Sequence, residues 1–185
     1  MDFFFLRQDL FGDATGIELK GHTDTSAQFN WLDGVKFDRP FPRDTFLLDD
    51  AYGSNWPDFF DTTVPVMSSR LIDALRACGV SNLDTYPVVL RHERTGVEQV
   101  GYQAVNVIGR VDAIDLARSP HEVRRGKPRF RAAISLEPAR TAGLLAFRLL
   151  VGPPFIVVTA PVAARLREGR FDSLLLQPTT AFDGD

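Results

Sequence analysis

Residues 64–87 read VPVMSSRLIDALRACGVSNLDTYP, and residues 155–178 read FIVVTAPVAARLREGRFDSLLLQP, which is the same pattern of residue classes without a gap at an offset of 91 positions. Each stretch predicts a short apolar strand, a helix behind a Ser or Thr cap with apolar residues at i, i+3 and i+4, and a second strand that ends at proline. The alternative to duplication is convergence, because unrelated strand-helix-strand units share the same residue classes. Two copies are also too few for a solenoid. We expect an internal duplication that supplies a scaffold.

The helix in each unit is expected to bury one face. Leu71 and Leu75 fall on the inward side of the first helix, together with the single cysteine, Cys78. Gly79 and Gly169 stand where the two helices are expected to stop. One cysteine forms no intrachain disulfide, which favours a cytoplasmic location, and apolar neighbours are expected to raise the pKa of its thiol.

Composition predicts one domain over residues 1–185. Hydrophobic residues make up 44% of the chain and charged residues 24%, as in ordinary globular proteins. The sequence contains no apolar run long enough to span a membrane, and its first residues lack the basic stretch of a secretory signal. We therefore expect a cytoplasmic protein with no membrane partner, whose first residues form a strand.

Charge and aromatic residues are concentrated in the first third. Residues 1–61 contain 12 acidic and 5 basic side chains and 13 of the 20 aromatic residues, although the net charge of the whole chain is only −3. An acidic surface with exposed aromatic rings suits the steering and retention of a basic partner. The alternative is that the rings fill a core and the carboxylates are solvated.

Further elements follow from turn signals. Residues 83–108 resemble an antiparallel hairpin, and the segment after residue 130 is expected to return to a strand. Residues 117–131 contain six cationic side chains and two prolines, which predicts an exposed loop. The last seven residues, 179–185, are expected to fray. The predicted fold is one α+β domain in which a mostly antiparallel sheet is covered by the two helices of the repeated units.

No motif of a nucleotide-binding protein or hydrolase is present in the sequence. Three scattered histidines make a poor ligand set, so we expect no metal, no cofactor and no catalytic residue. Two other functions stay open. A small metal-dependent hydrolase would use Asp49, Asp50, Asp58 or His22. A regulatory nucleic-acid scaffold would use Arg118, Arg124, Arg125, Lys127, Arg129 and Arg131, although the acidic chain makes nucleic acid the weaker expectation.

The chain resembles the immunity-protein family of bacterial polymorphic toxin systems, in particular the Myxococcus-type family first described as a domain of unknown function. The resemblance spans about residues 42–178, and residues 102–115 are its most specific part. The residues that carry it are 46–52, 57–60, 67–71, 74–75, 79–80, 86–88, 101–102, 105–115, 119, 147–149 and 155–159. The basic segment 117–131 departs from the usual form of the family.

The resemblance implies a cytoplasmic protein without enzymatic activity that binds and neutralises a toxin, generally one encoded beside it. Such a protein benefits from fast electrostatic association and slow release from aromatic anchors. The predicted interface consists of Asp49, Asp50, Trp56, Asp58, Phe59 and Asp61. The alternative for these residues is a loop whose rings simply fill the core beneath it. The sequence specifies neither the toxin nor the oligomeric state.

Overall fold

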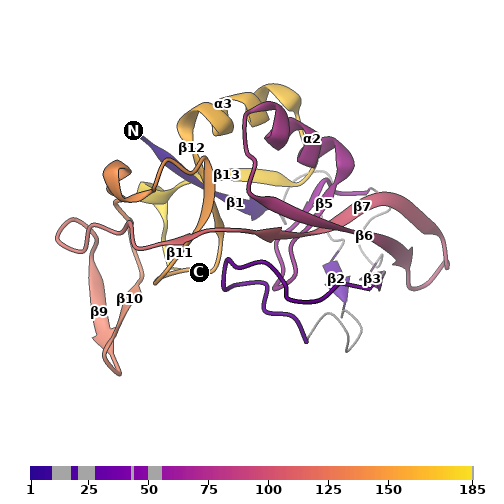
Figure 1. Ribbon diagram of the computed structural model, residues 1–185, viewed down its shortest axis with the longest axis horizontal. Helices are drawn as coiled ribbons and strands as arrows, with labels where there is room; N and C mark the ends of the chain where they lie inside the picture. Colours follow the sequence, from indigo (N-terminus) through magenta and orange to yellow (C-terminus); the bar gives the residue numbers. More distant parts are fainter. Residues whose placement is uncertain (10–17, 21–27, 43, 50–55, 185) are drawn as a thin grey trace.

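In the computed structural model of the protein, residues 1–9, 18–20, 28–42, 44–49 and 56–184 are described. They form an α+β fold of curled, mostly antiparallel sheets, with two α-helices side by side on one side (Figure 1). The helices are α2 (Ser69–Ala77) and α3 (Ala160–Gly169). The strands are β1 (Phe3–Gln8), β2 (Glu18–Lys20), β3 (Asp44–Asp49), β4 (Phe59–Phe60), β5 (Val66–Ser68), β6 (Leu83–His92), β7 (Glu98–Val107), β8 (Arg110–Val111), β9 (His121–Arg124), β10 (Lys127–Phe130), β11 (Ala146–Leu149), β12 (Ile156–Thr159) and β13 (Leu174–Pro178).

The described strands pair into three sheets. A five-stranded sheet has the order β13-β1-β12-β11-β8, a six-stranded sheet has the order β2-β3-β6-β7-β5-β4, and β9 and β10 form a separate two-stranded ribbon. The pairs β3–β6 and β8–β11 are parallel, and every other described pair is antiparallel. The expected hairpin over residues 83–108 is confirmed as β6–β7. The expected first strand is confirmed as β1.

The first unit has the order strand, helix, strand that its sequence predicts, but its second strand does not end at Pro87, because β6 continues to His92. Ser68 caps α2, and its hydroxyl accepts a hydrogen bond from the backbone N–H of Leu71. Leu71 and Leu75 are buried, while Cys78 is half-buried, and burial raises the pKa of its thiol. Gly79 follows the helix with a φ of 90°, a left-handed conformation that glycine adopts without a Cβ penalty.

The second unit has the same order of elements but ends its helix differently. Thr159 occupies the cap position of α3 but makes no capping hydrogen bond. The expected stop at Gly169 is wrong by one residue, because Gly169 is the last helical residue and Arg170 takes the left-handed conformation with a φ of 47°. Glycine is still needed at 169, since a Cβ there would lie 2.4 Å from the Phe171 ring.

A central strand lies beside each unit in the same register. β7 pairs antiparallel with both strands of the first unit, β5 and β6, and β1 pairs antiparallel with both strands of the second unit, β12 and β13. The pair Met67–Gln103 corresponds to Val158–Phe4, and the pair Tyr86–Ala104 corresponds to Gln177–Phe5. In both cases the unit residues differ by 91 positions and the partner residues by 99.

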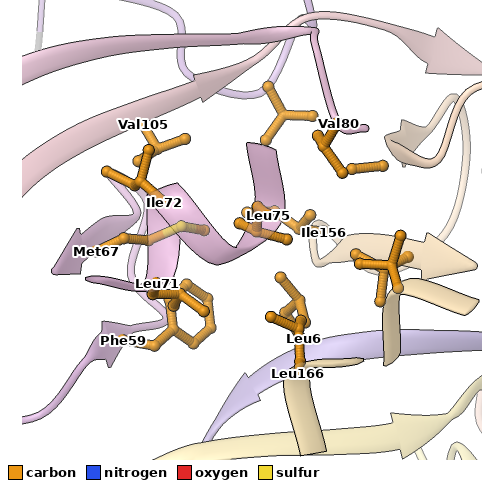
Figure 2. Packing of buried hydrophobic residues seen from close by; sticks show 14 of the residues in the cluster. Leu6, Phe59, Met67, Leu71, Ile72, Leu75, Val80, Val105, Ile156 and Leu166 are labelled. Carbon is orange, nitrogen blue, oxygen red and sulfur yellow. The ribbon is translucent and has the colours of Figure 1, made fainter. Parts of the chain in front are cut away.

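The main core lies between the two helices and the strands beneath them. Leu71 and Leu75 of α2 and Leu166 of α3 pack with Leu6 of β1 and Ile156 of β12 (Figure 2). All five side chains are buried, and each buried leucine or isoleucine contributes roughly 1.5–3 kcal/mol. The contact joins both units into one core.

A second core takes up aromatic rings of the first third. Trp31, Phe46 and Phe60 are almost fully buried and pack with residues of β6 and β7. These rings therefore fill the interior, which is the alternative to an exposed aromatic surface. A third cluster packs Phe5, Phe147 and other residues on the opposite side of β1.

Two further expectations are corrected. Residues 179–184 do not fray, because Thr179 and Phe182 are buried and the Thr179 carbonyl accepts a hydrogen bond from Ile134 N–H. Residues 131–136 form no extended strand, and only the isolated bridge between Ile114 and Leu136 is found among them. In the part of the chain that the structure describes, neither helix has the length and apolar character needed to cross a membrane.

Candidate functional site

The six residues predicted to form an interface do not share one open surface. Asp50 lies outside the described residues, and of Asp49 only the backbone is described, at the end of β3. Trp56 is half-buried, with its ring 4.2 Å from the ring of His92. Asp58, Phe59 and Asp61 are each held by contacts inside the protein.

Phe59 and Asp58 are removed from the surface by the pairing of β4 with β5. Phe59 is 0% exposed in the main core, and Asp58 is 6% exposed. Adjacent strand residues face opposite sides, so Phe59 and Phe60 enter the two different cores. Both side chains are therefore poorly placed for direct contact with a partner in this fold.

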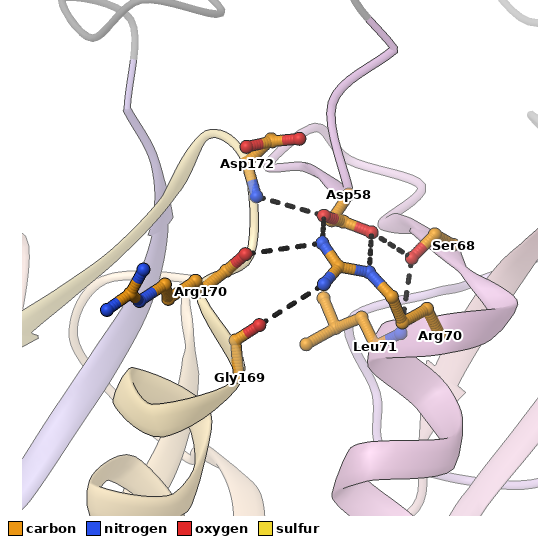
Figure 3. Close-up of polar contacts among 7 residues, drawn as sticks. All are labelled: Asp58, Ser68, Arg70, Leu71, Gly169, Arg170 and Asp172. Atoms are coloured by element: carbon orange, nitrogen blue, oxygen red, sulfur yellow. Dashed lines mark hydrogen bonds and ion pairs between the residues drawn. The ribbon is translucent and has the colours of Figure 1, made fainter.

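Asp58 is the centre of a polar network that joins the two units (Figure 3). Its carboxylate accepts hydrogen bonds from the Ser68 hydroxyl, from the Arg70 guanidinium and, over 2.9 Å, from the backbone N–H of Asp172. Arg70 also donates to the carbonyls of Gly169 and Arg170 over 3.2 and 3.3 Å. The start of α2 is therefore tied to the end of α3, and the Asp58 oxygens are occupied by partners of the protein itself.

Asp61 sits in a second, half-buried charge cluster. Its carboxylate accepts a hydrogen bond of 3.1 Å from Arg7 Nε, and the Arg7 guanidinium lies 3.8 Å from the ring centre of Phe155. Burial raises the pKa of Asp61 to about 6, against the opposing influence of Arg7 and Arg148. Burial also lowers the pKa of Arg148 to about 10, and its Nε and Nη2 atoms have no partner among the described residues. Asp61 thus acts as a counter-charge within the fold.

The least buried element of the described structure is the β9–β10 ribbon. It extends away from the sheets in Figure 1, and all residues from His121 to Lys127 are exposed. Arg125 and Gly126 form its two-residue turn with φ values of 50° and 74°, as in the type I′ turns that suit hairpins. The expected loop over 117–131 is therefore in part an ordered hairpin.

The register of the ribbon gives it two different faces. Arg124 pairs with Lys127, and Glu122 pairs with Arg129, so that these four side chains share one face. The other face consists of His121, Val123, Pro128 and Phe130. Phe130 is buried in the third core cluster, whereas Val123 is 68% exposed. The ribbon is therefore anchored by the Phe130 ring, while its Arg and Lys side chains and Val123 are exposed to solvent.

The stem of the ribbon is fixed to the body of the protein. Ser119 is buried, and its hydroxyl accepts a hydrogen bond of 2.9 Å from Ser135 N–H. The Ser119 carbonyl lies 2.9 Å from His121 Nδ1, which serves as the donor in this contact. The His121 ring lies 5.7 Å from the ring of Phe130. These contacts fix the direction in which the ribbon projects.

No group of three or more His, Cys, Asp or Glu side chains gathers among the described residues. His22, one residue of the hydrolase alternative, lies outside the described residues together with Asp50. Asp58, the third carboxylate of that alternative, is held by Ser68, Arg70 and Asp172.

No protein-family model matches the sequence, and no curated protein matches it. The resemblance to immunity proteins therefore rests on the residue pattern alone.

The ribbon is the surface that sequence reasoning identified only as a basic segment. The sequence feature that could have predicted a hairpin is the pair Arg125-Gly126, which stands between two four-residue stretches, HEVR and KPRF. The sequence did not predict these two strands, because most of their residues on one face are Arg or Lys, which are typical of loops. Pro128 also argues against a strand.

Proposed function

We propose that this protein neutralises a toxin by stoichiometric binding, as the immunity proteins that it resembles do. The observation that carries the proposal is the ordered β9–β10 ribbon, which places exposed cations and an exposed valine outside the body of the protein. The partner is a toxin encoded by the neighbouring reading frame, and the encounter takes place in the cytoplasm.

The ribbon gains little stability from burial in the protein. A two-stranded hairpin is marginal in water, and ordering each residue costs about 1–2 kcal/mol of backbone entropy. Of its eight paired residues, only Phe130 is buried. An element that gains so little from the core is better explained by contacts with another molecule.

We also propose that the scaffold is a duplication of one strand-helix-strand unit, residues 64–87 and 155–178. The matching element order and the equal registers of β7 and β1 support this proposal. The repeated units hold the core together through Asp58 and the two helices, whereas the ribbon lies between them in the chain. The binding element is thus an insertion carried by a symmetric support.

Titrated co-expression with the neighbouring product tests the proposed function. The toxin gene is induced at a fixed level while the level of this protein is raised stepwise. A stoichiometric inhibitor restores growth sharply when its amount reaches that of the toxin. An unrelated soluble protein at the same level serves as the control. Continued growth arrest with folded protein in excess contradicts the proposal, and so does full rescue at a small fraction of the toxin level, which indicates catalysis.

A further inference from the structure

We propose that the β9–β10 ribbon docks on an acidic, partly apolar surface of the partner protein, with its cationic face supplying charge and Val123 supplying an apolar anchor. The inference rests on the proposed function and names the chemistry of its partner. The acidic first third led us to expect a basic partner, whereas the ribbon calls for an acidic one. Asp58 and Asp61 of the first third are already paired within the fold.

The charge arrangement points to an anionic partner. Arg124 and Lys127 are directly opposite one another, and like charges at such a pair destabilise a hairpin. Arg124, Arg125, Lys127 and Arg129 form no ion pair with any described residue. Carboxylates of a partner would relieve this repulsion and make charge-assisted hydrogen bonds with the guanidinium groups.

The other face of the ribbon favours a protein over a nucleic acid. Val123 is 68% exposed and neighbours Pro128 across the strand pair, so the ribbon offers an apolar strip on the face opposite its cations. A phosphate backbone makes no contact that would bury such an apolar strip, whereas a protein surface can bury it. Protein interfaces combine an apolar centre with a charged rim.

A groove at the base of the ribbon extends the surface. It is bordered by Phe130 and Arg131 on one side and by Gly152 and Pro153 on the other. A Cβ at Gly152 would lie 3.2 Å from Ile114 and 3.5 Å from the Phe130 ring, so this backbone packs closely against the anchor of the ribbon.

Pre-organisation makes the ribbon an efficient docking element. Its stem is fixed by the hydrogen bonds between Ser119 and Ser135 and by the packing of Phe130. Less conformational entropy is lost on binding when the contact residues are already ordered. Exposed cations also raise the association rate with an acidic surface at low salt.

The test measures the affinity of the full chain for the purified product of the neighbouring reading frame, at about 50 and about 200 mM NaCl. One variant combines Arg124→Glu, Lys127→Glu and Arg129→Glu. Its matched control combines Lys36→Glu, Arg76→Glu and Arg165→Glu, three exposed cations away from the ribbon with the same change in net charge. Circular dichroism and thermal unfolding establish that both variants are folded.

We expect the ribbon variant to bind about 100-fold more weakly at low salt and to lose most of the salt dependence, while the control changes by less than about 3-fold. Val123→Ser is expected to weaken binding about 10-fold at both salt concentrations, because an apolar anchor is not screened. Equal affinities of the wild-type chain and the folded ribbon variant would overturn the inference and leave the proposed function standing.

Two further outcomes distinguish the remaining possibilities. Absence of binding by the wild-type chain would overturn the proposed function itself. Micromolar or tighter binding of a mixed-sequence DNA duplex of about 20 base pairs at physiological salt, abolished by the ribbon variant, would identify nucleic acid as the occupant and overturn the protein-docking inference.

Discussion

The two repeated units place a hydroxyl residue at the same position before their helices, but only the first of these hydroxyls is hydrogen-bonded. Ser68 accepts from Leu71 N–H and donates to Asp58, whereas the Thr159 hydroxyl is buried without a partner among the described residues. The helix stops also differ, since the first has Gly79 and the second has Arg170 in the left-handed conformation. The same local sequence pattern therefore produces the same elements with unequal stabilisation.

A similar contrast holds for the hairpins before the helices. Phe60 of β4 pairs with Val66, and Phe147 of β11 pairs with Val157 at the matching position of the second unit. The residues that follow these phenylalanines are Asp61 and Arg148, two opposite charges that influence each other. The two hairpins thus carry opposite charges at matching places, one residue after each phenylalanine.

The largest expected effect comes from breaking the tie between the units at Asp58. Asp58→Ala leaves the Ser68 hydroxyl, the Arg70 guanidinium and Asp172 N–H without their acceptor, so the free energy of unfolding should fall by about 3 kcal/mol. Urea unfolding measures it. Asp73→Ala on the exposed face of α2 is the control and should change stability by less than about 0.5 kcal/mol. Equal losses in both variants would show that the network does not join the units.

The next largest effect is a pH dependence of the free energy of unfolding that is caused by Asp61. Burial raises its pKa from 3.8 to about 6, so the folded state binds more protons than the unfolded state between these values. The contribution of Asp61 to stability is therefore fully present below about pH 4 and is lost as the pH rises through about 6, by roughly 2–3 kcal/mol. Because an amide does not titrate, Asp61→Asn should gain stability relative to the wild type by this amount between pH 4 and pH 7. A constant difference in unfolding free energy across that range would rule out the shift.

The cap comparison is smaller and can be made with one substitution in each unit. Ser68→Ala removes a cap that is hydrogen-bonded and should lower stability by about 1.5 kcal/mol. Thr159→Val replaces a buried hydroxyl without a partner by a methyl group, so stability should stay within about 0.5 kcal/mol or rise. Thermal and urea unfolding report both values. A loss for Thr159→Val as large as that for Ser68→Ala would mean that the two caps are equal.

The smallest effects are expected at the helix stops, and they have opposite signs. Gly79→Ala forces a side chain into a φ of 90° and should destabilise by about 1 kcal/mol. Arg170→Gly relieves a φ of 47° and should stabilise by about 0.5 kcal/mol, since the carbonyl that Arg70 contacts is retained. Destabilisation by both substitutions would show that the Arg170 side chain contributes more than its backbone strain removes.

Sequence reasoning succeeded where the signal is local. The helix and the two strands of each unit follow from residues within about 25 positions, so their order was predictable from periodicity and capping chemistry. The end of α3 and the end of β6 were not, because Gly169 is still helical and β6 continues past Pro87 to His92. The position of β1 within its sheet was not predictable, because β1 pairs with β12 and β13 near the other end of the chain. Nor was the burial of Asp58, which depends on a hydrogen bond from Asp172, 114 positions away. Its surface role was inferred from neighbours in sequence, whereas its partners are distant.

The most direct test of the proposed function is calorimetric titration of the purified chain into the purified product of the neighbouring reading frame. The expected result is saturation at one chain per partner molecule, with nanomolar affinity that weakens as salt is raised. Absence of saturable heat at concentrations of about 10 μM or more, with both proteins folded, would contradict the account.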